Sequence, residues 1–303
     1  MTVPRVSICI PAFKAERYLA ETLASVRAQT CGDWEVIVTE DGSRDGTEAV
    51  VRAFAATVSQ PVRYTRHDPN RGLPATRNAG IEAARADWIA LLDSDDLWTP
   101  DHLATCLATA EATGAELIHG GSILFDSDTG RELGHRVPSP EAVAALPLSL
   151  FRNKYVVQPA SVLLHRRLWE RAGRFDPTFR YVEDRDMWLR CARAGGRIAY
   201  TGQETCRYRK HATALSNNSA AMAEAAARVF DKHLDWDAIP EDLRRTRCAE
   251  AWGAAARLRW RTEPALARDH LRRACAVRWR LSWRLAAILC AGLNLLPLHR
   301  HAR

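Results

Sequence analysis

The amino-acid sequence predicts an α/β fold, with a mixed, mostly parallel sheet flanked by helices and a helical appendage after it. Three observations predict this fold class. Short apolar runs alternate with amphipathic segments over roughly the first 120 residues. The alternation is lost between Gly120 and Ala160, and the chain beyond Ser219 becomes rich in Ala, Arg and Trp. Strands that alternate with helices pair in parallel and place ligand sites at their carboxyl ends.

The first elements follow from hydrophobic periodicity. The β-rich run Val6–Phe13 predicts a strand, and apolar residues at helical spacing from Leu19 to Thr30 predict a helix that Gly32 ends. The next predicted elements are a strand at Trp34–Thr39, a helix carrying Val50, Phe54 and Val58, a strand at Val62–Thr65, a helix at Thr76–Ala84 and a strand at Trp88–Leu92.

Two helix starts are predicted from capping residues. The segment Asp45–Glu48 resembles a capping box, and Thr99 followed by Pro100 suits an N-cap and a first helical turn. In the less regular stretch that follows, Ile123–Phe125 and Val156–Leu164 are predicted strands.

The charge of the chain is concentrated at its C-terminal end. Residues Glu241 to Arg303 hold 14 Arg and 5 acidic side chains, which is +9, whereas the whole chain carries +7. The first 240 residues are therefore nearly neutral. An apolar content of 47% and a charged content of 26% exclude a disordered or collagen-like chain.

Cysteine usage and the N-terminal segment indicate the compartment. The eight cysteines are scattered without a CxxC pair, so we expect reduced and mostly buried thiols. The segment Met1–Ser7 runs directly into a predicted strand and lacks the apolar stretch of a secretory signal. We therefore expect the site to face the cytoplasm.

Two carboxylates follow the predicted strand Trp88–Leu92. Asp93 and Asp95 are two residues apart where the strand ends, so their side chains can project to the same side. Hard carboxylate oxygens suit Mg²⁺ or Mn²⁺, which in turn bind phosphate oxygens. By itself, such an acidic run is more often a solvated turn, and other motifs have to support it.

Four linked motifs supply that support. They are Pro11-Ala-Phe13 with Tyr18, Thr22, Ser25 and Gln29, then Glu40–Thr47, Asn70–Gly80 and Leu92–Trp98. In this order and spacing the chain resembles glycosyltransferase family 2, the inverting enzymes of GT-A fold, over roughly residues 4 to 215. It departs from the family pattern at Glu40, where Asp is frequent, and at Lys14, where Asn is frequent.

The resemblance implies a donor site. It assigns Pro11, Phe13 and Asp41 to the nucleotide base, Arg77 to the neighbourhood of the nucleotide, Asp93 to the ribose and Asp95 to the Mg²⁺ or Mn²⁺ ion. A carboxylate such as Asp41 can accept a base N–H, and Arg77 can complement phosphate charge. The alternatives are a simple turn at Asp41 and a surface position for Arg77.

The resemblance also implies a base and a closing segment. The segment from Phe179 to Arg190 is similar to the acidic catalytic motif of the family, which makes Asp184 the catalytic base. Asp184 lies at a predicted helix start, whose positive end favours the ionised carboxylate, although a simple N-cap is the alternative. The segment Tyr208–His211 resembles the one that closes over the donor and implies His211 near the metal, with a surface histidine as the alternative.

The basic tail allows two interpretations. Its Arg side chains are interleaved with Trp, as at a membrane interface with anionic lipid, and a helix packed on the catalytic domain with solvated Arg is the equal alternative. The apolar stretch Leu285–Leu298 has 14 residues, short of the roughly 20 needed to span a bilayer. No nucleic-acid module accompanies the charge, so no nucleic-acid partner is expected.

We divide the chain into a GT-A domain at 1–219 and a basic helical region at 220–303. In the first, 1–121 is the predicted nucleotide-sugar-binding half and 122–219 the acceptor-binding and catalytic half. The stretch Gly120–Ala160 is expected to shape the acceptor pocket.

The implied function is inverting, metal-dependent transfer of a sugar from a nucleoside-diphosphate donor, UDP by family habit, to a saccharide or lipid-linked saccharide acceptor. The implied setting is polysaccharide or glycoconjugate biosynthesis in the cytoplasm or at the cytoplasmic face of the membrane. A sugar nucleotidyltransferase is an alternative, but Pro11–Glu16 lacks the glycines of a phosphate loop. A non-catalytic sugar-binding scaffold is another, which the joint presence of four carboxylates disfavours: Asp41, Asp93, Asp95 and Asp184.

Overall fold

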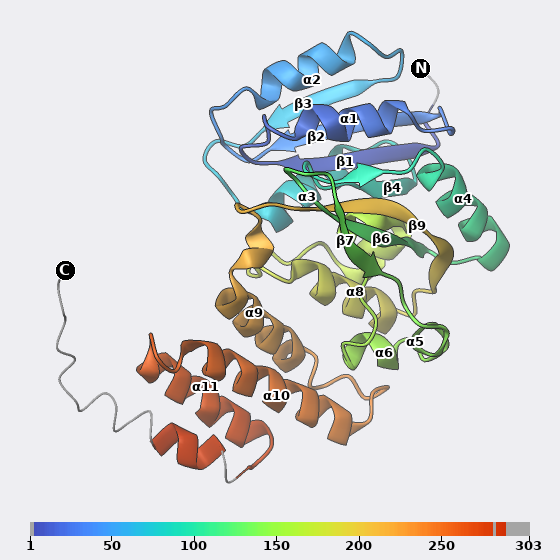
Figure 1. Cartoon of the computed structure of the whole chain (residues 1–303). Coiled ribbons are helices and arrows are strands. Elements are labelled where there is room, and N and C mark those ends of the chain that lie inside the picture. Colours follow the sequence, from blue (N-terminus) through green and yellow to red (C-terminus); the bar gives the residue numbers. More distant parts are fainter. Residues whose placement is uncertain (1–2, 281–282, 289–303) are drawn as a thin grey trace, which may run out of the picture. The chain divides into compact units, whose positions relative to one another are not determined.

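The computed structural model describes residues 3–280 and 283–288 (Figure 1). The chain forms two compact units, which divide between Ala212 and Thr213. The first unit contains every described strand, and the second is helical.

The strands of the first unit form one nine-stranded sheet in the order β3-β2-β1-β4-β8-β6-β9-β5, with β7 paired to β6. They are β1 Val6–Ala12, β2 Trp34–Glu40, β3 Val62–Arg66, β4 Trp88–Leu91, β5 Leu97–Trp98, β6 Leu117–Asp126, β7 Glu132–Arg136, β8 Val162–His165 and β9 Ile198–Lys210.

Strand direction changes where the sequence pattern changes. Strands β1 to β4 are mutually parallel, as the alternation of strands and helices predicts. Strand β8 is antiparallel to both β4 and β6, whereas β6 and β9 are parallel. The predicted mixed, mostly parallel sheet flanked by helices is confirmed, and the loops after β1, β2 and β4 meet at one edge.

Helices follow most of the strands. In the first unit they are α1 Leu19–Arg27, α2 Thr47–Ala55, α3 Leu73–Ala83, α4 His102–Thr113, α5 Pro140–Ala144, α6 Leu148–Phe151, α7 Arg166–Ala172 and α8 Glu183–Arg193, with a 3₁₀ turn at Pro159–Ser161. Helix α3 begins three residues before its predicted start. The predicted strand Val156–Leu164 is wrong in its first half, because Pro159–Ser161 forms that turn and β8 begins only at Val162.

Both predicted helix caps are wrong. The N-cap of α2 is Gly46, and Asp45 instead accepts hydrogen bonds from the Thr47 hydroxyl and amide, at 2.7 and 3.3 Å. The N-cap of α4 is Asp101, because the Thr99 amide donates to the Thr205 carbonyl at 3.1 Å. The Gly46 amide also donates to the Glu16 carboxylate at 2.9 Å. Long-range hydrogen bonds, which local sequence does not encode, are therefore present at both helix starts.

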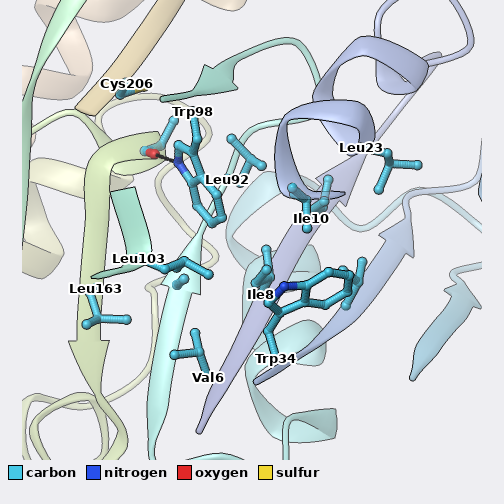
Figure 2. Close-up of a cluster of buried hydrophobic side chains, with 14 of the residues drawn as sticks. Val6, Ile8, Ile10, Leu23, Trp34, Leu92, Trp98, Leu103, Leu163 and Cys206 are labelled. Carbon is cyan, nitrogen blue, oxygen red and sulfur yellow. Dashed lines mark hydrogen bonds between the residues drawn. The ribbon is translucent and has the colours of Figure 1, made fainter. Parts of the chain in front are cut away.

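The core lies between the sheet and helices α1, α2 and α4. Figure 2 shows Val6, Ile8 and Ile10 of β1 in the same cluster as Leu23 of α1. In the same view Trp98 donates its indole N–H to the Ala160 carbonyl at 2.5 Å, which joins β5 to the turn before β8. Every residue of β1 is buried, as expected for a parallel strand covered on both faces.

The second unit consists of α9 Ser219–Lys232, α10 Glu241–Arg259 and α11 Pro264–Val277, and residues 283–288 are also helical. The predicted helical appendage is therefore confirmed. Within it, Trp283, Ala286 and Ala287 pack against a small core of Ala256, Ala267 and Leu271.

Two sequence expectations concern cysteines and membrane segments. The seven cysteines that the structure describes are all free thiols, and five of them are buried. Most of the apolar stretch Leu285–Leu298 lies outside the described residues. Among residues 3–280 and 283–288, none of the helices combines the length and apolar character that a membrane crossing requires.

A buried carboxylate ties β2 to its neighbours. Glu35 accepts hydrogen bonds from the Ser7 hydroxyl at 2.7 Å and from the Arg85 amide at 2.7 Å, and it pairs with Arg63 at 3.1 Å. Burial alone would raise the pKa of Glu35, but the hydrogen bonds from Ser7 and Arg85 and the charge of Arg63 lower this pKa below its ordinary value.

We expect Glu35→Gln to lower the free energy of unfolding by about 2 kcal/mol at pH 7, because it leaves Arg63 and Arg85 without their anion. Since the folded pKa is depressed, this contribution is complete above the unfolded pKa of about 4.3 and is lost as the pH falls through the folded value. Urea denaturation of both proteins at stepwise lower pH measures it. The control is Glu48→Gln, which removes an exposed ion pair with Arg52 and should change the free energy of unfolding by less than about 0.5 kcal/mol. A difference in stability between the wild type and Glu35→Gln that stays constant with pH would contradict the assignment.

Candidate active site

The site lies where β1, β2 and β4 end. Pro11 is buried in β1, whereas Phe13, just after the strand, is 50% exposed. The next residue, Lys14, has a left-handed backbone with φ of 53°, and its amide donates to the Ser43 hydroxyl at 3.0 Å. This turn leaves an aromatic face open at the edge of the sheet, next to the loop after β2.

Asp41 is an internal anchor of this loop. Its carboxylate accepts hydrogen bonds from the amides of Arg71 and Gly72, both at 2.8 Å, and lies 2.9 Å from His67 Nδ1. Burial alone would raise the pKa of Asp41, but these bonds lower it below its ordinary value. Gly72 has φ of 88°, a conformation that suits glycine, and α3 begins at the next residue. Asp41 therefore fixes the start of α3.

Glu40, the departure from the family pattern, is also buried. Its carboxylate accepts hydrogen bonds from the Ser43 hydroxyl at 2.5 Å and from the Tyr64 hydroxyl at 3.0 Å. The longer glutamate side chain thus joins the turn after β2 to β3.

Arg77 is the largest of the fully buried charged side chains of the site. It is only 2% exposed, and it donates hydrogen bonds to Asp93 Oδ1 at 2.7 Å and to Glu183 Oε1. Burial alone would lower the pKa of Arg77, but the charges of Asp93 and Glu183 raise it above its ordinary value. The guanidinium therefore stays charged and joins the loop after β4 to the start of α8.

Asp95 is the accessible carboxylate of the loop after β4. Its side chain is 35% exposed, and its Oδ2 lies 2.9 Å from His211 Nε2. The Tyr18 ring lies against His211, with 5.0 Å between the ring centroids. Asp95 and His211, which are 116 positions apart in sequence, are therefore neighbours in the folded protein.

Arg209 holds the acidic loop in place. Its Nε donates to the Asp95 carbonyl at 2.7 Å, its amide donates to Asp96 Oδ1 at 2.8 Å, and its guanidinium pairs with Glu21 at 2.9 Å. The side chain is buried against the rings of Tyr18 and Phe125. Sequence reasoning missed this role, although Arg209 lies inside the motif that singled out His211.

Asp184 is the second residue of α8 and is partly exposed. The side chains of Glu183, before it, and of Asp186, two residues after it, are both buried. Asp186 pairs with Arg190 at 2.8 Å, so it is committed to the helix. The negative charge of Asp184 contributes to raising the pKa values of Arg77 and Asp93. Asp184 thus directly follows the residue that pairs with Arg77, and it is partly exposed where Glu183 is buried.

The structure brings together Arg77, Asp93 and Glu183, and separately Asp95 and His211. Glu183 was not identified as a site residue from the sequence; its place before Asp184 was the available signal. Within the part of the chain that the structure describes, no group of three or more His, Cys, Asp or Glu side chains is arranged to hold a metal ion by itself.

A separate pocket of about 710 Å³ lies in the second half of this unit. It is lined by Val137, Ser139, Glu141, Ala142, Ala145, Ser149, Arg152 and Lys154. Its lining comes from the stretch Gly120–Ala160, and it combines hydroxyl groups with charges of both signs.

The parallel strands with an acidic loop after β4, followed by the antiparallel strand β8, define an α/β protein of the GT-A fold. The chain belongs to glycosyl transferase family 2, whose family model matches residues 7–171. The protein is therefore a glycosyltransferase.

Two relatives illustrate the family match. The succinoglycan biosynthesis protein ExoO of Rhizobium meliloti (strain 1021) is 35% identical over 208 residues, which cover 65% of this chain and 58% of that protein. The putative glycosyltransferase EpsE of Bacillus subtilis (strain 168) is 30% identical over 202 residues, which cover 66% of this chain and 71% of that protein. The chain thus spans little more than half of the first relative.

Two solved structures share the fold. S. aureus TarS 1-349 in complex with UDP-GlcNAc has a TM-score of 0.65 at 15% identity, covering 95% of this chain and 80% of that one. The mannosyltransferase PcManGT from Pyrobaculum calidifontis, in complex with GDP-Man and Mn²⁺, has a TM-score of 0.63 at 18% identity, covering 97% and 88%. At this identity the likeness establishes the fold alone.

We expect Asp41→Asn to lower the free energy of unfolding by about 2 kcal/mol, because the amide NH₂ would face backbone N–H donors that now share a carboxylate. Thermal and urea denaturation measure the change. The control is Asp128→Asn, which removes an exposed ion pair with Arg17 and should cost less than about 0.5 kcal/mol. Equal effects of the two substitutions would show that Asp41 does not anchor the loop.

Proposed function

We propose that the protein transfers a sugar, with inversion, from a nucleoside-diphosphate donor to an acceptor hydroxyl in polysaccharide or glycoconjugate biosynthesis. The observation that carries this proposal is the link through Arg77 between Asp93, in the acidic loop, and Glu183, beside Asp184. The link spans the two halves that donor and acceptor binding require, in a chain that belongs to a glycosyltransferase family.

The nucleotide base is proposed to stack on the half-exposed ring of Phe13, beside buried Pro11. Asp41 acts by shaping the loop at Arg71 and Gly72, because both of its oxygens already accept protein N–H groups. Arg77 is committed to two carboxylates, so we assign it to holding Asp93 toward the ribose. UDP is the proposed nucleotide; the solved neighbours bind UDP-GlcNAc and GDP-Man.

Asp95 and His211 suit a divalent cation. One is a partly exposed carboxylate and the other an imidazole 2.9 Å away, which are ligand types that Mg²⁺ or Mn²⁺ accepts. Two protein ligands leave positions for phosphate oxygens of the donor. When bound, the cation supplies a Lewis acid that offsets negative charge on the departing nucleoside diphosphate.

Asp184 is the proposed base. Its carboxylate takes the proton of the acceptor hydroxyl as that oxygen attacks the anomeric carbon from the side opposite the diphosphate. The new bond forms as the old one breaks, which inverts the configuration, and such assistance is typically worth about 10²- to 10⁴-fold in rate. A sugar nucleotidyltransferase, the earlier alternative, does not fit the family to which the chain belongs.

We expect UDP to bind with an affinity that rises at least about tenfold with Mn²⁺, which corresponds to 1.4 kcal/mol, and Asp95→Ala to remove that gain. The measurement is calorimetric titration with UDP, GDP and dTDP, each with and without Mn²⁺. Asp101→Ala is the matched control. It removes a carboxylate at the start of α4, and this variant should bind the nucleotide like the wild type. If no nucleotide binds, the transferase proposal fails in favour of an inactive scaffold.

We further propose that the second unit associates with anionic membrane surfaces. Its last described segment exposes Trp279, Leu285 and Ile288 by 61, 52 and 62%, next to the exposed cations Arg280 and Arg284. Exposed apolar side chains beside arginines suit lipid headgroups, each arginine contributing roughly 1 kcal/mol at an anionic surface.

We expect the protein to float with vesicles that contain phosphatidylglycerol, but not with vesicles of phosphatidylcholine alone. The triple variant Trp279→Ala, Leu285→Ser, Ile288→Ser should lose at least about tenfold in binding, since it removes the apolar contact. Leu258→Ser, an exposed leucine of α10, is the control. Unchanged flotation of the triple variant would favour the alternative, solvated arginines on a packed helix.

A further inference from the structure

Arg77 joins three segments of the catalytic unit. It lies on α3, it donates to Asp93 after β4 at 2.7 Å, and it donates to Glu183 at the start of α8. Its guanidinium lies over the Phe175 ring, 5.6 Å from the centroid. Leaving one of these charges unpaired would be costly because Arg77 and Glu183 are buried, so the three segments are held in one arrangement.

A second tie strengthens this junction. The Asn78 side chain of α3 accepts from the Phe175 amide at 2.9 Å and donates to the Phe175 carbonyl at 2.8 Å. Helix α3 is therefore bonded both to the loop that leads into α8 and to the first residue of α8. The start of α8 cannot shift relative to α3 without breaking these bonds.

The start of α8 is also strained. Val182, its N-cap, has φ of 59° and ψ of 22°, a left-handed conformation that is a genuine outlier for a β-branched residue. Such a conformation persists only where surrounding contacts impose it, and it is concentrated at functional sites. Here it lets buried Glu183 reach Arg77 while the next side chain, Asp184, stays partly exposed.

Two consecutive carboxylates are thus given different tasks. Glu183 is buried and paired with a guanidinium, so it has no access to an acceptor hydroxyl. Asp184 is partly exposed, and its orientation depends on where α8 begins. A displacement of about 1 Å in such a group can cost on the order of 10²-fold in rate.

We propose that Arg77 and Glu183 are positioning residues that fix Asp184 relative to the loop of Asp93 and Asp95. Binding of the donor nucleotide at that loop is thereby coupled to the order of the first turns of α8. The inference rests on the proposed function, because it concerns the base and the donor loop of the same reaction.

The first test is hydrogen–deuterium exchange of the full chain with UDP and Mn²⁺. Nucleotide binding should slow exchange in the first two turns of α8 by about fivefold in the wild type. Glu183→Gln should keep UDP binding within about threefold and lose this slowing, because the link between loop and helix is cut. Equal slowing in both proteins, or none in the wild type although UDP binds, would overturn the proposal.

The second test separates kcat from KM, with water as the acceptor of a UDP-sugar. Glu183→Gln should lower kcat by about 30- to 100-fold and change KM by less than about threefold. Glu116→Gln is the matched control, since Glu116 pairs with Arg167 and Arg171 outside the site, and its kcat should equal that of the wild type. A Glu183→Gln enzyme with wild-type kcat, or one that loses UDP binding together with kcat, would refute a positioning role.

Two further variants keep the test decisive. If Glu183→Gln does not fold, Glu183→Asp retains the charge but is one methylene shorter, and it should still lower kcat about tenfold at unchanged KM. Wild-type kcat in Glu183→Asp would then overturn the proposal. Asp184→Asn distinguishes failure of the proposed base from failure of the positioning role. If Asp184→Asn retains full turnover, the assignment of Asp184 as the base fails. If Asp184→Asn is inactive while Glu183→Gln is fully active, only the positioning role of Arg77 and Glu183 is refuted.

Discussion

The catalytic unit depends on one buried cation. Arg77 meets carboxylates from the loop after β4 and from the start of α8, and these segments come from the two halves of the unit. Since a guanidinium presents its N–H groups in a rigid fork, it fixes both the distance and the orientation of its partners. Burial makes this constraint strong, because Arg77 and Glu183 lie away from water and cannot be separated without a large electrostatic cost.

The surrounding carboxylates fall into two classes according to exposure. Asp41 and Glu40 accept several protein hydrogen bonds, so they fix the loops after β2 and before α3. Asp95 is partly exposed beside His211, and Asp184 is partly exposed at the start of α8. The fold thus uses buried acids to set loop geometry and leaves Asp95 and Asp184 open to solvent.

The two units have different physical characters. The first is nearly neutral and builds its site from a sheet edge, whereas the second carries the excess of arginine on helices with small alanine-rich contacts. Family membership establishes the class of reaction, whereas the donor, the metal and the acceptor are proposals.

The sequence by itself determined the alternation of strands and helices, the edge where Asp93 and Asp95 lie, the helical tail and the family, because periodicity and linked motifs are local and ordered along the chain. Only the tertiary structure decided that Asp41 is enclosed, that Arg77 binds Glu183, that Arg209 holds the acidic loop and that α2 and α4 begin at tertiary hydrogen bonds. These features depend on partners from about 30 to more than 100 positions away, and no local pattern encodes which buried donor meets which acceptor.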